Sequence, residues 1–188
     1  MHGYGGPLED DVYALAIGPS NDVLVTGKLD YGSDGSQQID FGLGPLLGSG
    51  DQWEIFIARL STIGELKWAQ RFGGPGDQQA FGLGVFGSKI VFGGQFFGSL
   101  TVGTFTVNHF SQNGADAYAG SVAYADGSGT WLERISSAND ETVTTDAAVS
   151  HEGNAILVGY FAGVTQFADT DLTSSGTNDG FCVEIAPK

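Results

Sequence analysis

Three aspartates that follow one another closely are the residues best suited to hold a metal ion. Asp30 and Asp34 lie in the turn-rich segment Asp-Tyr-Gly-Ser-Asp-Gly, and Asp40 follows shortly after it. Hard cations such as Ca²⁺ prefer several carboxylate and carbonyl oxygens on a loop of this kind. The segment departs from an EF-hand loop, because Gly32 stands where an oxygen ligand is needed and no distal Glu follows. Two interpretations therefore stay open: a calcium site, or solvated turn residues.

Two aromatic residues close to this loop are candidates for binding a ligand. Trp53 alternates out of phase with Phe56 along its expected strand, so its ring should face solvent when Phe56 faces the core. Tyr31 lies in the loop 30–38, which is longer than the corresponding loops of the other repeats, and we expect its ring to be exposed as well. Such aromatic faces, beside Asn and Asp side chains, suit sugar rings. Ala115 and Asn178 stand where the repeat described below would place further tryptophans, so a glycan site here would be unique.

Residues that could catalyse a reaction do not form a recognisable set. The three histidines are scattered, and no pair has the spacing of zinc ligands. Adjacent carboxylates recur at equivalent places, as in Asp10-Asp11 and Asp140-Glu141, which favours a structural role over one acid–base pair. Residues 82–87 match Gly-x-Gly-x-x-Gly, but a strand rather than a helix is expected after them. We therefore expect no enzyme activity and no organic cofactor.

The single cysteine, Cys182, cannot form an intrachain disulfide. It stands in the strand-like run 180–185 without a neighbouring His or basic residue. We therefore expect a small buried apolar side chain rather than a nucleophile.

The charge of the chain argues against nucleic acid as a partner. Its 188 residues include 22 acidic and only 7 basic side chains, which gives a formal net charge of −15. Attraction to phosphate backbones or anionic membranes depends on Lys and Arg, which are scarce here. No window approaches 18 consecutive apolar residues, so we expect no membrane insertion.

An internal repeat of about 63 residues organises the chain. Each copy opens with an acidic turn, continues with an apolar strand that ends in glycine, and later has an acidic residue two positions before an aromatic one. These anchors are Asp10, Asp77 and Asp140; Gly27, Gly94 and Gly159; and Phe56, Tyr118 and Phe181. Trp68 and Trp131 mark a further strand in two copies. We assign copy one to 7–74, copy two to 75–137, and the incomplete copy three to 138–188.

The pattern within each copy predicts an all-β protein. Short apolar runs alternate with Gly, Asn, Asp and Ser, and 31 glycines oppose long helices. The strands expected in the first copy are 12–17, 23–28, 39–41, 55–60 and 66–72. Four main strands per repeat fit a four-stranded antiparallel blade of a β-propeller, with small residues at 14–16 and 82–84 where strands crowd toward an axis. A β-helix or a sandwich remains the alternative.

Several short motifs recur in the two fuller copies. The first copy contains Asp-Phe-Gly at 40–42, Phe-Ile-Ala-Arg-Leu at 56–60 and Trp-Ala-Gln-Arg-Phe-Gly-Gly at 68–74, and the second repeats the plan at 73–80, 93–100, 114–118 and 131–135. Together these motifs resemble the SBBP (β-propeller) repeat of bacterial secreted and cell-surface proteins. The resemblance covers nearly the whole chain. It implies a propeller fold and an extracellular or cell-envelope location, and it implies no catalytic residue.

Three copies are fewer than the four to eight blades of an ordinary closed propeller. Unpaired sheet edges invite association, so we expect either a homo-oligomer or a part of a longer propeller. In the first case residues 2–6 would complete the missing outer strand of the third copy. The expected function is a non-catalytic binding or structural scaffold with a protein or glycan ligand. The alternative is a carbohydrate-binding lectin.

Overall fold

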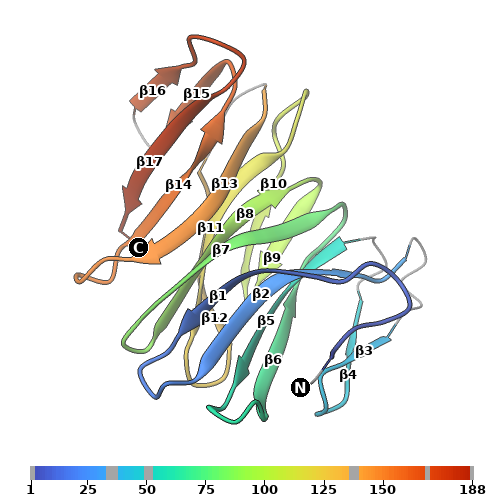
Figure 1. The fold of residues 1–188 in the computed structure, drawn as a ribbon. Coiled ribbons are helices and arrows are strands. Elements are labelled where there is room, and N and C mark those ends of the chain that lie inside the picture. The colour runs from blue at the N-terminus through green and yellow to red at the C-terminus, as the bar shows by residue number, and fades with distance from the viewer. Residues whose placement is uncertain (1–2, 33–37, 49–52, 136–139, 168–169, 187–188) are drawn as a thin grey trace.

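The computed structural model describes residues 3–32, 38–48, 53–135, 140–167 and 170–186. Within these ranges the regular secondary structure consists of β-strands alone, and neighbouring strands are antiparallel (Figure 1). The all-β prediction is therefore confirmed. No helix in the described ranges could cross a membrane. The sheets contain two to four strands each and form no closed ring in this part of the chain.

Three main sheets follow one another along the chain. The first contains β1 (Asp11–Ile17), β2 (Val23–Asp30), β5 (Trp53–Leu60) and β6 (Leu66–Phe72). The second contains β7 (Gln78–Phe86), β8 (Lys89–Phe96), β11 (Asp116–Ala123) and β12 (Gly129–Arg134). The third contains β13 (Thr142–Val149), β14 (Ala155–Phe161) and β17 (Asp179–Ile185). Each sheet is a meander, so the second strand pairs with both the first and the third.

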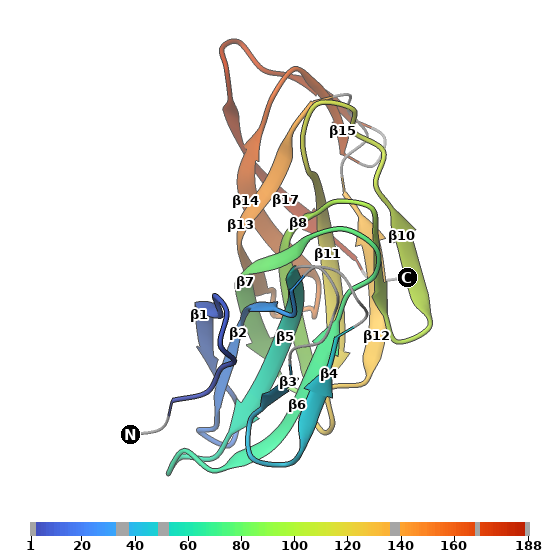
Figure 2. The ribbon, with the colours of Figure 1, turned by 90° about the vertical axis from the view of Figure 1, so that its right-hand side faces the viewer.

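A short hairpin connects the second and third strands of every main sheet. The hairpins are β3 (Gln38–Asp40) with β4 (Pro45–Leu47), β9 (Ser99–Val102) with β10 (Phe105–Asn108), and β15 (Val164–Phe167) with β16 (Thr170–Thr173). Figure 2 shows the three main sheets stacked one above another, with β10 along one side of the second sheet. The chain therefore builds the same strand order three times, with a fourth main strand in the first two sheets.

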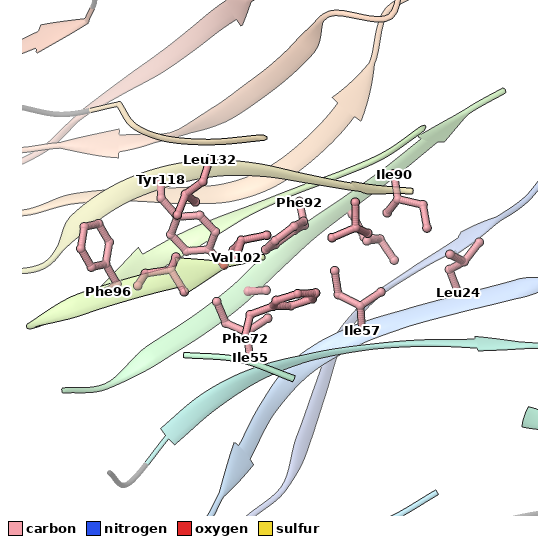
Figure 3. Packing of buried hydrophobic residues seen from close by; sticks show 14 of the residues in the cluster. Leu24, Ile55, Ile57, Phe72, Ile90, Phe92, Phe96, Val102, Tyr118 and Leu132 are labelled. Atoms are coloured by element: carbon pink, nitrogen blue, oxygen red, sulfur yellow. The ribbon is translucent and has the colours of Figure 1, made fainter. Parts of the chain in front are cut away.

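Apolar side chains fill the space between the first and second sheets (Figure 3). Ile55, Ile57 and Phe72 of the first sheet are buried with Phe92 and Tyr118 of the second, and the rings of Phe72 and Phe92 are stacked 5.7 Å apart. A second cluster, between the second and third sheets, includes Ala117, Trp131, Leu157 and Phe181. A third cluster joins the β3–β4 hairpin to the first sheet and includes Leu29, Tyr31, Ile39 and Phe56. Burial on both faces makes the second sheet the centre of the core.

The first strands of the three sheets lie next to one another, with β7 between β1 and β13. A Cβ atom on Gly82 would overlap the backbone of Ala147, and one on Gly84 would lie 2.6 Å from the Cα of Ala148. Only glycine permits strands to approach this closely. The small residues at 82–84 thus do bring neighbouring strands into close contact, as their spacing predicts.

A polar cluster joins the first two sheets at one end. The carboxylate of Asp22 accepts hydrogen bonds from the guanidinium of Arg59 and from the hydroxyl of Tyr124, the latter at 2.9 Å. Lys67 completes the ion pairs, with its Nζ 3.0 Å from Asp22 Oδ1. Trp68 Nε1 donates to the backbone carbonyl of Tyr124 at 3.1 Å, so the connection spans both sheets.

Candidate functional site

Two of the three predicted calcium ligands, Asp30 and Asp40, serve as turn caps in the structure. Asp30 Oδ1 accepts the backbone N–H of Gly32 at 2.9 Å, and Asp40 Oδ1 accepts the N–H groups of Gly42 and Gly44 at 2.6 and 3.0 Å. Asp34 lies outside the described residues. The described part of the chain contains no group of three or more His, Cys, Asp or Glu side chains that could share a metal ion. A calcium requirement accordingly stays a prediction.

The two predicted ligand-binding aromatics lie in different environments. Tyr31 is fully buried in the cluster beneath the β3–β4 hairpin, so the expectation that it is exposed is wrong. Tyr31 directly follows β2, and its ring packs with Leu29 and Ile39 in the core. Trp53 is half-buried: its Nε1 donates to Asp30 Oδ2 at 3.3 Å, and the Nζ of Lys28 lies 4.1 Å from the centre of its ring. Its ring is therefore already in contact with a cation of the same chain.

Cys182 is exposed on β17, so the expectation of a buried apolar side chain is also wrong. The physical reason is the alternation of side chains along a strand. Phe181 and Val183 point toward the second sheet, and Cys182 points to the opposite face of the third sheet. Ala119, at the equivalent place in the second sheet, is buried because a further sheet covers it.

A structural feature that was not predicted recurs in the first strand of every sheet. The register of β1, β7 and β13 against the neighbouring strand shifts by one residue at Tyr13, Phe81 and Thr145 respectively. Such a β-bulge adds one residue to one strand and turns its side chain away from the regular alternation. Bulges are frequent next to functional sites, because they re-aim a side chain.

Each bulge requires a glycine at the position opposite it in the neighbouring strand. Gly27, Gly94 and Gly159 pair with the residue that precedes the extra one. A Cβ on each glycine would overlap the carbonyl oxygen of the first strand, contributed by Asp11, Gln79 and Val143 respectively. The repeated glycines that organise the sequence are thus explained by three equivalent bulges.

The three bulges meet in one cleft, the inner cleft, which has a volume of about 550 Å³. It is lined by Tyr13, Phe81, Gln95, Glu141, Val143, Thr145 and Tyr160. The rings of Tyr13 and Phe81 are tilted against each other with their centres 5.0 Å apart. A groove of about 600 Å³ beside β6 is lined mainly by Gly, Thr and Ser, with Gln70, Arg71 and Phe72. The inner cleft is the better candidate, because all three sheets contribute equivalent residues to it.

Several hydrogen-bonding groups lie in and beside the inner cleft. Burial raises the pKa of Tyr160, and the carboxylate of Glu141, with which it forms a hydrogen bond, raises it further. Burial also raises the pKa of Tyr13, whose hydroxyl donates to Asp11 at 3.1 Å. Both phenols therefore stay protonated at neutral pH. Gln95 adds an amide whose Nε2 donates to Gln79 Oε1 at 2.8 Å, so the cleft offers aromatic faces beside hydrogen-bonding groups.

Sequence reasoning missed the inner cleft, although one signal for it was present. Tyr13 and Phe81 stand 68 residues apart, close to the repeat length, and both precede a strand that ends in the anchor glycine. A period-two pattern assigns both residues to ordinary strand positions. Only the bulges bring them into one site.

Neither a comparison with protein-family models nor one with curated proteins finds a match for this chain. The resemblance to SBBP repeats accordingly stays a prediction from the motifs.

Proposed function

We propose that this chain is a three-bladed β-propeller segment that acts as a non-catalytic binding or structural scaffold, outside the cell or in the cell envelope. Each main sheet would be one blade, with its first strand nearest the axis. The observation that supports this proposal is the recurrence of strand order, hairpin and bulge in all three sheets. The SBBP-like motifs support the location.

Self-association is part of the proposal, and exposed apolar side chains support it. Leu15 and Ile17 on β1 are 66% and 58% exposed, and Val158 on β14 is 38% exposed. Contiguous exposed apolar surface commonly marks an interaction site. The β3–β4 hairpin covers part of the outer face of the first sheet, and β1 leaves the rest exposed. Packing this exposed part in one chain on the outer face of the third sheet in another would extend the row of sheets. A head-to-tail contact of this kind closes into a ring when the rotation permits.

The experiment that tests self-association is light scattering at several protein concentrations, with and without a chelator. We expect a dimer or a larger oligomer, and we expect the variant Leu15→Ser/Ile17→Ser to shift the mass toward the monomer. Ile63→Ser is the matched control, because Ile63 is 74% exposed in a turn away from β1. A monomer at every concentration would contradict this part of the proposal. A fall in mass with the chelator would support a calcium site.

A lectin is the second candidate, and the composition of the inner cleft favours it. Tyr13 and Phe81 provide aromatic faces, while Gln95 and Glu141 provide an amide and a carboxylate, which suit sugar hydroxyls. A glycan array should then show saturable binding that Tyr13→Ala abolishes. Trp53→Ala tests the site expected from the sequence. If Trp53→Ala loses glycan binding and Tyr13→Ala keeps it, the glycan site lies near Trp53 and the loop 30–38 rather than in the inner cleft.

A further inference from the structure

The third sheet differs from the first two at one edge. In the first sheet β5 pairs with β2 on one side and β6 on the other, and in the second sheet β11 lies between β8 and β12. The equivalent strand of the third sheet, β17, pairs with β14 alone among the described residues. Figure 1 shows β17 at the outer edge of its sheet. An unpaired edge of this kind is a template for another strand.

The observed register makes β5, β11 and β17 equivalent residue by residue. Phe56, Tyr118 and Phe181 each lie opposite the anchor glycine of the second strand of their sheet. On their other side Phe56 lies opposite Arg71 and Tyr118 lies opposite Arg134. The place opposite Phe181 on the free side of β17 therefore corresponds to an arginine.

A buried acidic residue forms an ion pair with this arginine in both complete sheets. Arg71 Nη1 lies 2.6 Å from Glu54 Oε2, and Arg134 Nη1 lies 3.6 Å from Asp116 Oδ2. Both carboxylates are inaccessible to solvent. A buried carboxylate of this kind is costly unless it is paired, so the arginine of the fourth strand helps to offset its burial in these two sheets. Asp179 of the third sheet is only partly buried.

Asp179 is the equivalent acidic residue of the third sheet. Its Oδ2 accepts the backbone N–H of Ser175 at 2.9 Å, just as Asp116 Oδ2 accepts the N–H of Phe110. Asp179 thus keeps the contact that fixes the preceding loop. Within the described residues it has no cationic partner, and no fourth strand pairs with β17 there.

We propose that the free edge of β17 binds an extended strand that carries the pattern Trp-x-x-Arg-apolar. Backbone hydrogen bonds along β17 would provide affinity, and the Asp179 carboxylate would select the arginine, which is the usual division of roles in strand addition. The tryptophan would lie opposite Glu184, as Trp68 lies opposite Arg59 and Trp131 opposite Ser121. The tryptophan side chain would lie on the same exposed face of the third sheet as Cys182.

The N-terminal segment is a poorer match for this edge. Residues 2–6 contain no arginine, and the ring of Tyr4 lies 5.3 Å from that of Phe41 in the same chain. The N–H of Gly6 also donates to Asp10. These contacts hold residues 4–6 against Asp10 and the turn of the β3–β4 hairpin. The edge of β17 is therefore assigned to an arginine-bearing strand rather than to residues 2–6 of a second copy.

The test uses a fluorescent peptide with the sequence of residues 64–74, which contains Trp68 and Arg71. Anisotropy titration of the whole chain should show saturable binding, and hydrogen exchange should slow within Asp179–Ile185. Replacing Arg71 by Ala in the peptide, or Asp179→Asn in the protein, should each weaken binding at least about tenfold, because a desolvated charge pair is broken. Asp179→Glu should bind nearly as well as the wild type, because the first sheet uses Glu54 at this place.

Several outcomes would overturn the proposal. They are the absence of binding, binding indifferent to both Arg71 and Asp179, protection at β1 or β6 in place of β17, and equal binding of a peptide of residues 1–10. Circular dichroism of each variant separates lost binding from lost folding. The outcome is independent of self-association, because light scattering with Leu15→Ser/Ile17→Ser reports on the sheet faces and the peptide reports on the edge.

Discussion

A single buried carboxylate, Asp22, collects three polar side chains where the first two sheets meet. The hydrogen bonds from Lys67, Arg59 and Tyr124 outweigh burial and lower the pKa of Asp22 from 3.8 to about 2. A carboxylate with a depressed pKa in the folded state stabilises the fold above the unfolded-state pKa and loses this effect as the pH falls. The contribution of Asp22 should therefore be complete above about pH 4 and should disappear toward pH 2.

Urea unfolding from pH 2 to pH 7 tests this prediction. Asp22→Asn should lower the midpoint at pH 7, and the difference from the wild type should shrink between pH 4 and pH 2. Asp171→Asn is the control, because Asp171 is exposed on β16. A difference between wild type and Asp22→Asn that is constant across this range would contradict the assignment.

The anchor glycines provide a second prediction at the scale of residues. Gly94→Ala should destabilise the fold by about 1–3 kcal/mol, because the added Cβ overlaps the carbonyl oxygen of Gln79. Gly176→Ala should change stability little, because nothing lies within 4 Å of its Cβ position. Chemical denaturation of both variants measures the difference. Equal stabilities would mean that the bulge at Phe81 relaxes without cost.

At the scale of elements, the fourth strand of each complete sheet fixes the next sheet through its tryptophan. Trp131 on β12 is 5% exposed and lies in the cluster between the second and third sheets, together with Leu157 and Phe181. Trp131→Ala should lower the free energy of unfolding by about 3–5 kcal/mol. Phe105→Ala on β10 serves as the control, because Phe105 is 39% exposed. Thermal unfolding followed by circular dichroism compares the two variants, and equal losses would show that Trp131 does not connect the sheets.

The strands themselves could be predicted from the sequence, and some of their consequences could not. The five strands expected in the first copy agree with β1, β2, β3, β5 and β6 to within two residues. The short strand β4 was not predicted, because it begins with Pro45 and proline weakens a strand pattern. The inner cleft was not predicted, because a bulge changes which side chains meet without changing the local composition. Tyr31 shows the same limit: the polar residues that follow it in the sequence do not reveal that its own side chain is buried in the core.

At the scale of the whole molecule, apolar interfaces compete with a high net charge. The chain carries a formal charge of −15, and like charges oppose association unless salt screens them. The screening length falls from about 30 Å at 0.01 M salt to about 8 Å at 0.15 M. If the exposed residues of β1 drive assembly, added salt should strengthen association. Salt weakens the repulsion between the chains, while the apolar contact itself depends little on such salt concentrations.

We therefore expect the mass measured by light scattering to rise between about 10 and 300 mM NaCl at a fixed protein concentration. Leu15→Ser/Ile17→Ser should show a smaller rise. CaCl₂ at equal ionic strength distinguishes screening from a specific site near Asp30 and Asp40. The same mass in both salts indicates screening alone, while a larger mass in CaCl₂ that a chelator reverses indicates bound calcium. A mass that falls as salt is added would mean that charged groups, rather than the apolar face of the first sheet, hold the chains together.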